Sequence, residues 1–240
     1  MKTQPVKILI ATVMLAQSAR ADLWNVDFGS DVRGGGGPPP MKVGFAATGI
    51  SASDYWNFYT ADNPDGSYKV NGFLSNLKNA GGTTTGVGIK VNNGDGAFTY
   101  GSTDPMLHEY IYSLSGGALQ TIVTVTNLPA GNYNFYLYGA DSHFDLKVGA
   151  TDYGPKISYD NPLINPPPWV EGHQYVRYAN VPVGASQSVE ITPGTGTDYY
   201  QGIIGGMQIE LVPEPSCALL LSLGGLLVAC RARKAGLVGD

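Results

Sequence analysis

The sequence predicts an all-β fold, an antiparallel β-sandwich or jelly roll, with an N-terminal signal peptide and a C-terminal transmembrane helix. The chain of 240 residues has 33 Gly, 16 Pro and 15 Tyr, which is typical of many turns between aromatic-rich strands. Residues 22–211 show no long helical periodicity. Short alternating or apolar runs recur there with turn residues between them, as in sandwiches and jelly rolls.

The individual strands follow from these runs. Strands are expected at Trp24–Phe28, Val87–Val91, Ala97–Tyr100, Glu109–Leu114, Thr121–Thr126, Tyr133–Gly139, Phe144–Val148, Tyr175–Val181, Ser188–Ile191 and Met207–Leu211. The Asn-Asn-Gly-Asp-Gly turn at 92–96 predicts that the second and third of these form a hairpin. One short helical turn is expected at Ser75–Ala80.

Residues 1–21 have the pattern of a secretory signal peptide. Lys2 and Lys7 give a positive start, the run at 6–16 is mostly apolar, and Ala19-Arg20-Ala21 is a small-x-small site with cleavage expected before Asp22. The apolar run is too short to span a bilayer. We therefore treat residues 22–211 as the exported domain.

A second targeting pattern begins at residue 212. Val212-Pro213-Glu214-Pro215 precedes an uncharged stretch at 217–230, which Arg231 and Arg233 follow. This order resembles the PEP-CTERM sorting signal, also known as the ice-binding protein C-terminal domain. The resemblance covers residues 212–234, and the tail at 235–240 extends beyond the basic cluster where the family usually ends.

The PEP-CTERM resemblance implies recognition by an exosortase-type enzyme and delivery to the cell surface, outer envelope or extracellular polymer. The uncharged stretch is shorter than the ~20 residues of an ordinary spanning helix, so we expect a transient or weak membrane anchor. The basic cluster predicts a cytoplasmic C-terminus by the positive-inside rule. The domain at 22–211 would then lie outside the cell.

Charge and cysteine content exclude several functions for the exported domain. Residues 22–211 contain 17 of the 19 acidic residues but only 8 of the 14 basic ones, a net charge of −9. Nucleic-acid binding is not expected, because phosphate contacts need Lys and Arg. Both cysteines, Cys217 and Cys230, lie in the C-terminal segment, which excludes disulfides and thiol catalysis from the domain.

Four short motifs in the exported domain carry a further resemblance. They are Asn25–Gly29, Tyr55–Asn57, the Leu128–Gly131 turn before an aromatic strand, and Ile204–Ile209. Together they look like galactose-binding-like or malectin-like jelly rolls, domains that accompany carbohydrate-active proteins. This resemblance implies a fold more than a ligand.

Aromatic side chains beside hydrogen-bonding groups are the candidate glycan site. A sugar offers an apolar face and a polar rim, so its site needs an exposed ring with amide or carboxylate neighbours. Trp56, Asn57 and Tyr59 form one such group, and Trp169 with Glu171 forms another. The alternative is that these rings fill the core, which is the expected place of Trp24.

Catalytic and metal motifs are weak, and we expect no catalytic residue. The G-x-S-x-G, H-E-x-x-H and P-loop patterns are absent. Asp141, His143 and Asp145 alternate and could bind a metal, but solvated positions at the start of a strand explain them better. A structural calcium ion is the one cofactor left open, with Asp62, Asp65 and Asp95 as weak candidates in tight turns.

The sequence therefore predicts an exported, exosortase-sorted protein of the cell surface or extracellular matrix. Its expected role is non-catalytic, either binding an extracellular polysaccharide or serving as a structural component. The alternative is a carbohydrate-active or ester hydrolase whose site has no linear motif. A purely structural surface protein with all three tryptophans buried is the third reading.

Overall fold

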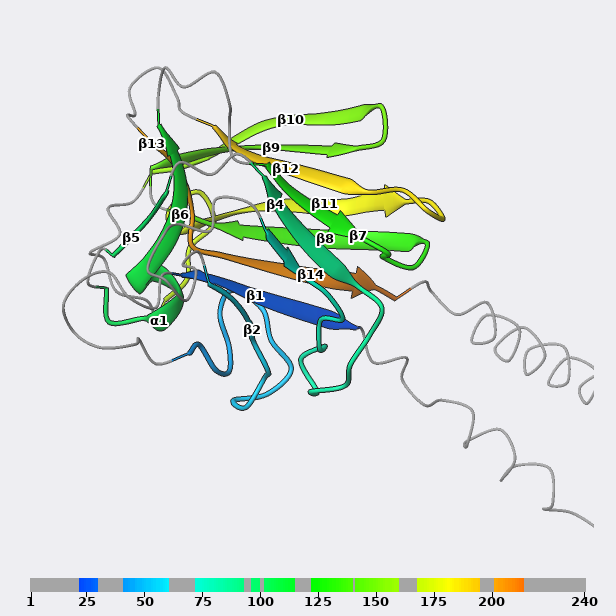
Figure 1. The fold of residues 1–240 in the computed structure, drawn as a ribbon, viewed down its shortest axis with the longest axis horizontal. Helices are drawn as coiled ribbons and strands as arrows, with labels where there is room; N and C mark the ends of the chain where they lie inside the picture. The colour runs from blue at the N-terminus through cyan, green and yellow to red at the C-terminus, as the bar shows by residue number, and fades with distance from the viewer. Residues whose placement is uncertain are drawn as a thin grey trace, which may run out of the picture. The chain divides into compact units, whose positions relative to one another are not determined.

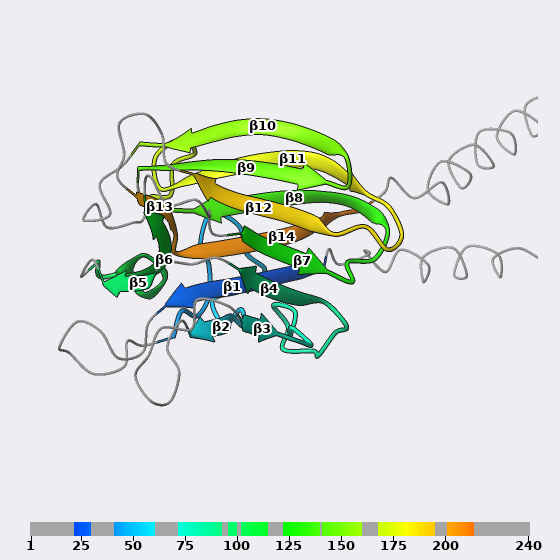
Figure 2. The same cartoon turned by 45° about the horizontal axis from the view of Figure 1, so that its top comes forward.

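The computed structural model describes residues 22–29, 41–60, 72–92, 96–99, 102–114, 122–139, 141–159, 168–194 and 201–213. Among these residues the regular structure is almost entirely β, with one four-residue helix, α1 (Pro105–His108). The predicted all-β sandwich is confirmed. Two large sheets form its layers, seen in two orientations in Figures 1 and 2.

The first layer is a five-stranded sheet. Its order is β11 (Tyr175–Val183), β8 (Gly131–Tyr138), β14 (Gly206–Val212), β1 (Leu23–Gly29) and β2 (Asn57–Thr60). Neighbouring strands are antiparallel except β1 and β2, which are parallel.

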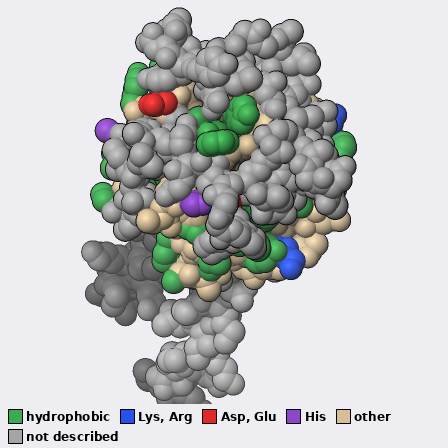
Figure 3. Space-filling view, turned by 60° about the vertical axis from the view of Figure 1, so that its left-hand side comes forward, with side chains coloured by type: hydrophobic (Ala, Val, Ile, Leu, Met, Phe, Trp, Pro, Cys, Tyr) green, Lys and Arg blue, Asp and Glu red, His purple; other side chains and the backbone are tan. Residues whose placement is uncertain are grey.

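The second layer is a six-stranded antiparallel sheet. Its order is β10 (Thr151–Ser158), β9 (Ser142–Val148), β12 (Val189–Gly194), β7 (Ile122–Thr126), β4 (Gly88–Asn92) and β3 (Gly72–Leu74). A third, three-stranded sheet contains β13 (Gln201–Ile204), β6 (Glu109–Leu114) and β5 (Gly96–Thr99). Figure 3 views the end where this sheet lies, and charged side chains of the described residues appear there as separate spots.

The core lies between the two large sheets because alternate side chains of each strand point inward. In β8 the inward residues are Tyr133, Phe135 and Leu137, all fully buried. They pack in one cluster with residues of the opposite sheet such as Phe144 and Ile191. The intervening residues of β8 face the other side of the five-stranded sheet, which we call the outer face.

The chain enters and leaves the sandwich at one place. The amide of Leu211 donates to the carbonyl oxygen of Asp22 at 2.8 Å, and Leu23 pairs with Glu210. The opposite end of the same two strands carries Asp27, which pairs with Gly206. Gly206 and Val212 are thus separated by the length of β14, about 20 Å at ~3.4 Å per residue.

Two local predictions are wrong. β4 and β5 do not form a hairpin, because β4 pairs with β3 and β7 whereas β5 pairs with β6 in another sheet. Residues 75–80 are not helical, because Lys78 and Asn79 form isolated β-bridges with Thr84 and Trp24. In both places the backbone N–H and C=O groups pair with other strands or bridges, and not within the hairpin or helical turn that the local residues favour.

The remaining predicted strands are confirmed with small shifts at their ends, and β6 matches its predicted bounds. Four strands were missed: β2, β3, β10 and β13. β10 contains Gly154 and Pro155, and its register with β9 shifts between Asp152 and Pro155. A bulge of this kind interrupts the alternation on which strand prediction depends.

Candidate functional site

The outer face of the five-stranded sheet carries most of the polar and aromatic side chains that the core does not use. The strand registers arrange them in rows across the sheet. One row runs Tyr175, Tyr138, Gly206 and Asp27. The next row runs Arg177, Tyr136, Gln208 and Asn25 in the same order of strands.

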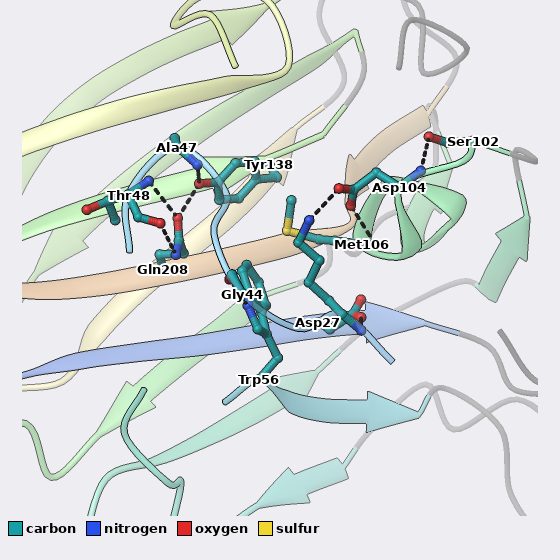
Figure 4. Close-up of polar contacts among 11 residues, drawn as sticks. Asp27, Gly44, Ala47, Thr48, Trp56, Ser102, Asp104, Met106, Tyr138 and Gln208 are labelled. Carbon is teal, nitrogen blue, oxygen red and sulfur yellow. Dashed lines mark hydrogen bonds and ion pairs between the residues drawn. The ribbon is translucent and has the colours of Figure 1, made fainter. Parts of the chain in front are cut away.

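Residues 41–56, which we call the strap, cross this face. The strap amide of Ala47 donates to the Tyr138 hydroxyl at 2.9 Å, and that of Thr48 donates to Gln208 Oε1 at 3.3 Å. In Figure 4 the strap passes over β14 at these two contacts. The strap therefore covers the middle of the outer face through its backbone.

Gln208 joins the strap to the sheet. Its Oε1 also accepts from the Tyr138 hydroxyl, and its Nε2 donates to Asn25 Oδ1 at 2.8 Å and to the Thr48 carbonyl at 3.1 Å. Both Gln208 and Tyr138 are fully buried. A buried polar network of this kind is favourable only when every member has a partner, so it fixes one position of the strap.

The strap holds its own shape by local contacts. Gly44 has φ +77°, and a Cβ there would lie 2.6 Å from the carbonyl oxygen of Ala52, so only glycine fits. The Asp54 carboxylate accepts from the amides of Ile50 and Ser51 at 2.6 and 2.7 Å. Trp56 Nε1 donates to the Gly44 carbonyl at 2.8 Å and closes the loop.

A buried charge cluster lies at the beginning of the strap. Asp27 is 2% exposed and accepts from the Lys42 amide at 3.3 Å. The Lys42 ammonium forms an ion pair with Asp104, whose Oδ1 also accepts from the Met106 amide at 3.0 Å and caps α1. Figure 4 shows Asp27 on β1 and Asp104 at the start of α1 on the side that the strap crosses.

The electrostatics of this cluster act mainly on Asp27. Burial raises the pKa of its carboxyl from 3.8 to about 7, because a charge is costly away from water. The Lys42 amide and ammonium oppose this rise, and the Asp104 charge adds to it. Asp27 is therefore a mixed population of acid and carboxylate near neutral pH.

A continuous line of aromatic rings lies along the edge of the strap. Trp169 meets Tyr138 edge-on with ring centroids 5.1 Å apart, and Tyr175 lies 5.5 Å from Tyr138 and 6.0 Å from Tyr136. We call these four residues the aromatic line. Tyr136 and Tyr138 are buried, whereas Trp169 and Tyr175 are partly exposed. The exposed part of the aromatic line is therefore Trp169 and Tyr175, which pack against the buried rings of Tyr136 and Tyr138.

Hydrogen-bonding groups adjoin this line. Glu210 Oε2 accepts from the Tyr136 hydroxyl at 3.0 Å and from Asn134 Nδ2 at 2.8 Å. Burial, with the neighbouring Glu210 charge, raises the pKa of Tyr136 to about 12, so this phenol remains protonated. The Arg177 guanidinium lies over the Tyr136 ring, with Cζ 5.6 Å from its centroid.

The first predicted glycan group is not an exposed platform. Trp56 and Tyr59 are each 1% exposed, and Asn57 is buried as well. Asn57 Nδ2 donates to the carbonyls of Asn25 and Lys78 at 2.9 and 2.7 Å, and Tyr59 packs in the main core. Trp56, the last residue of the strap, packs with Met106 and Tyr138 in a second buried cluster on the outer side of the sheet, so this group is not exposed and the alternative of buried rings holds.

The second predicted group lies at the aromatic line. Trp169 is partly exposed and belongs to the line, and the Lys42 ammonium lies 5.5 Å from its ring centroid. Glu171 is exposed and forms a backbone bridge with Tyr175. Its part in glycan binding stays a prediction. Trp24, as expected, packs in the core, where its Nε1 donates to Thr85 Oγ1 at 3.0 Å.

Several predicted residues lie outside the described part of the chain. These are the calcium candidates Asp62, Asp65 and Asp95, and the sorting residues Ala19, Ala21, Glu214, Pro215, Arg231 and Arg233. Among the residues that the structure describes, no group of three or more His, Cys, Asp or Glu side chains could hold a metal ion, so Asp141, His143 and Asp145 form no such site. Within the same residues, no helix has the length and apolar character needed to cross a membrane.

Sequence reasoning missed Asp27, Lys42, Gln208 and the contribution of Tyr175 and Arg177. One signal was available, because Asn25 and Asp27 alternate with Trp24, Val26 and Phe28 along β1. That alternation indicates a second, polar-lined face behind the core strand. Nothing local indicates that the strap covers this face.

Comparison with known proteins gives only distant structural similarity. No family model and no curated sequence matches the chain. The crystal structure of protein YxiM from Bacillus subtilis aligns with 79% of this chain at 13% identity and a TM-score of 0.41. The exo-β-1,3-galactanase of Phanerochaete chrysosporium, solved with galactose, aligns with 55% at 13% identity and a TM-score of 0.31. This chain spans 40% and 32% of the lengths of those two structures.

Proposed function

We propose that this protein is an exported cell-surface or extracellular-matrix protein whose β-sandwich, a jelly roll, binds a glycan without transforming it. The observation that carries the binding role is the aromatic line, in which Trp169 and Tyr175 are partly exposed beside fixed hydrogen-bonding groups. Rings of this kind match the apolar C–H face of a pyranose, and the surrounding polar groups match its hydroxyls.

The site is prebuilt, which favours binding. The buried rings of Tyr136 and Tyr138 support the exposed ones, and Gln208 fixes the strap beside them. A ligand therefore meets side chains that have already lost their rotamer freedom, which lowers the entropic cost of association. Asp27, whose pKa is raised to about 7, is buried under Lys42 and is not open to a ligand.

The sorting part of the proposal comes from the sequence. We propose that residues 1–21 direct export and that residues 212–234 are read by an exosortase-type enzyme. The sandwich suits such a terminal attachment, because Val212 ends β14 about 20 Å from the row that contains Gly206 and Tyr138.

A hydrolase remains the second candidate because of Asp27. A carboxyl with a pKa of about 7 beside a second acidic residue is the arrangement of a general acid. Its burial under the strap argues against this role, because a substrate would have to displace the Lys42 contact. Turnover of a polysaccharide that Asp27→Asn abolishes, without loss of binding, would favour this candidate.

Glycan binding is tested by affinity electrophoresis and calorimetry of the whole chain against a panel of bacterial and plant polysaccharides. Trp169→Ala and Tyr175→Ala are each expected to weaken binding by about tenfold, which corresponds to about 1.4 kcal/mol. Phe73→Ala is the matched control, because Phe73 is an aromatic residue 66% exposed on β3 of the other sheet. Equal loss in all three variants, or none in any, would contradict the assigned site.

Sorting is tested by intact-mass analysis and fractionation of the protein from its native cells. The expected species begins at Asp22 and ends near Pro213. Recovery of a membrane-bound species that retains Arg231 and Arg233 would mean a lasting anchor, and exosortase processing would be withdrawn.

A further inference from the structure

Arg177 has, among the residues that the structure describes, a buried side-chain nitrogen on the outer face without a hydrogen-bond partner. It lies on β11, at the edge of the five-stranded sheet, and pairs with Tyr136 on β8. Its side chain is only partly exposed, and its Nε is buried without a hydrogen-bond partner. A buried donor without an acceptor is costly, and more so on a charged group, so a ligand that supplies the acceptor gains that energy.

The charges around Arg177 leave it without a counterion. The ion pairs within 4.0 Å among the described residues are Lys42–Asp104 and Lys147–Asp152, and neither includes Arg177. A second cation is close, because Lys156 Nζ donates to the Arg177 carbonyl oxygen at 2.6 Å. The nearby Glu210 carboxylate accepts from Tyr136 and Asn134.

This isolation contrasts with the composition of the domain. Residues 22–211 contain 17 carboxylates and 8 cationic side chains, so intramolecular partners are in excess. Arg177 instead stacks over Tyr136, which fixes the plane of its guanidinium. A fixed guanidinium fork matches a planar carboxylate through two parallel hydrogen bonds.

The ring beside it defines the rest of the ligand. The Tyr175 centroid lies 6.0 Å from that of Tyr136, on the strand that carries Arg177, and Tyr175 is partly exposed. An anion-binding group and a sugar-stacking ring thus lie two residues apart on the same face of β11, and both adjoin the Tyr136 ring. A free inorganic anion would use only the first of these.

We infer that the glycan of this site is acidic, and that Arg177 binds the carboxylate of a uronate residue while Tyr175 contacts the sugar ring. This inference rests on the proposed glycan-binding function and names the class of its ligand. It also reconciles an acidic domain with an acidic polymer, because recognition depends on one desolvated guanidinium rather than on net charge.

The experiment compares polygalacturonate and alginate with their carboxyl-reduced, uncharged forms as ligands of the whole chain. Dextran sulfate and dextran form a second pair that offers an oxyanion without a uronate. The wild-type chain is expected to bind at least one uronate polymer about tenfold more tightly than its reduced form, with a preference that falls as salt rises. Equal binding of the acidic and reduced polymers would overturn the inference and leave the proposed function intact.

The variants identify the residue. Arg177→Gln is expected to abolish the uronate preference, so that the acidic and reduced polymers bind equally, and Arg177→Lys is expected to keep only part of that preference because the fork is lost. Lys147→Gln is the control, since it removes the same charge from a half-exposed side chain on β9. A uronate preference that survives in Arg177→Gln, or falls equally in Lys147→Gln, would refute the role of Arg177.

Two further outcomes separate the failures. Binding of dextran sulfate as tight as that of the uronate polymers would show a general oxyanion site and refute the carboxylate assignment. Absence of binding to every polymer, charged or neutral, would count against the proposed function itself. Unfolding midpoints of all variants, measured alongside, identify any variant that fails to fold. If Arg177→Gln does not fold, the uronate preference of Arg177→Lys decides whether Arg177 binds the carboxylate.

Discussion

Replacement of Asp27 by asparagine should make the protein more stable at neutral pH, because it removes a charge that is costly to bury. Asp27 accepts a hydrogen bond from the Lys42 amide, and the asparagine carbonyl oxygen can accept the same bond. What the substitution removes is the cost of ionising a group that is 2% exposed. The side chains are nearly equal in size, so packing against the strap is retained.

The magnitude follows from the pKa of the carboxyl group. Its value is 3.8 in the absence of burial and about 7 in the folded protein, a rise of about 3 units. At 1.36 kcal/mol per unit, ionised Asp27 lowers the free energy of unfolding by about 4 kcal/mol. Because the folded pKa is raised, Asp27 imposes no cost below about pH 4, and the cost grows until about pH 7.

Urea unfolding followed by tryptophan fluorescence measures this effect at about pH 4.5 and about pH 8. At the lower pH the two proteins should differ by only about 1 kcal/mol, because the carboxyl of the folded wild type is still protonated there. At the higher pH the midpoint of Asp27→Asn should exceed that of the wild type by about 2 M, for an m-value of about 2 kcal/mol/M. Asp152→Asn is the control, since Asp152 is exposed and its pKa is lowered by the Gly154 amide.

The reasoning would be refuted by a wild type and an Asp27→Asn variant whose stabilities change in parallel with pH. A parallel change would mean that Asp27 does not titrate in this range. A loss of stability in Asp27→Asn at both pH values would mean that the attraction between Asp27 and Lys42 exceeds the cost of burial.

Three further substitutions test the site. Gly206→Ala should destabilise by about 1–3 kcal/mol, because its Cβ would lie 2.2 Å from Met106 Sδ, whereas Gly86→Ala, with open space around it, should be nearly neutral in thermal unfolding. Tyr138→Phe should lower the free energy of unfolding by about 1–3 kcal/mol. It should also speed hydrogen exchange of the Ala47 amide, which donates to the Tyr138 hydroxyl, and unchanged exchange would contradict this. Trp56→Ala should cost about 3–5 kcal/mol in urea unfolding, and an effect below about 1 kcal/mol would mean that the ring is not buried.

The strands were predictable where their pattern is local and one-sided. β9 alternates buried and less buried residues from Ser142 to Val148, and the apolar positions alone locate it. The pairing of strands was less predictable. The turn at 92–96 favours a hairpin by its residues, yet β4 finds partners in β3 and β7, because those pairings cover its apolar face in the main core.

The candidate site was predictable only in part. Trp169 was singled out from its sequence neighbours and lies in the aromatic line. Trp56 was singled out by the same reasoning but is buried, and its Nε1 donates to the Gly44 carbonyl. The two tryptophans differ in what lies above them, and that is a property of residues elsewhere in the chain.

The sequence by itself determined the all-β class, the positions of most strands and the acidic, cysteine-free character of the domain at 22–211. These properties depend on composition and on neighbours within a few residues, which a sequence displays directly. It also carries the whole basis for the export and sorting proposals, at both ends of the chain.

Only the tertiary structure decided the site. Gln208 contacts Thr48 and Asn25 across 160 and 183 residues of chain, and the pKa of Asp27 is raised by its burial, to which the Asp104 charge adds. Burial and partnership are set by such distant contacts, because a polar group's energy depends on the atoms that replace its water. The unpartnered Nε of Arg177, among the residues that the structure describes, is visible for the same reason only in the folded chain.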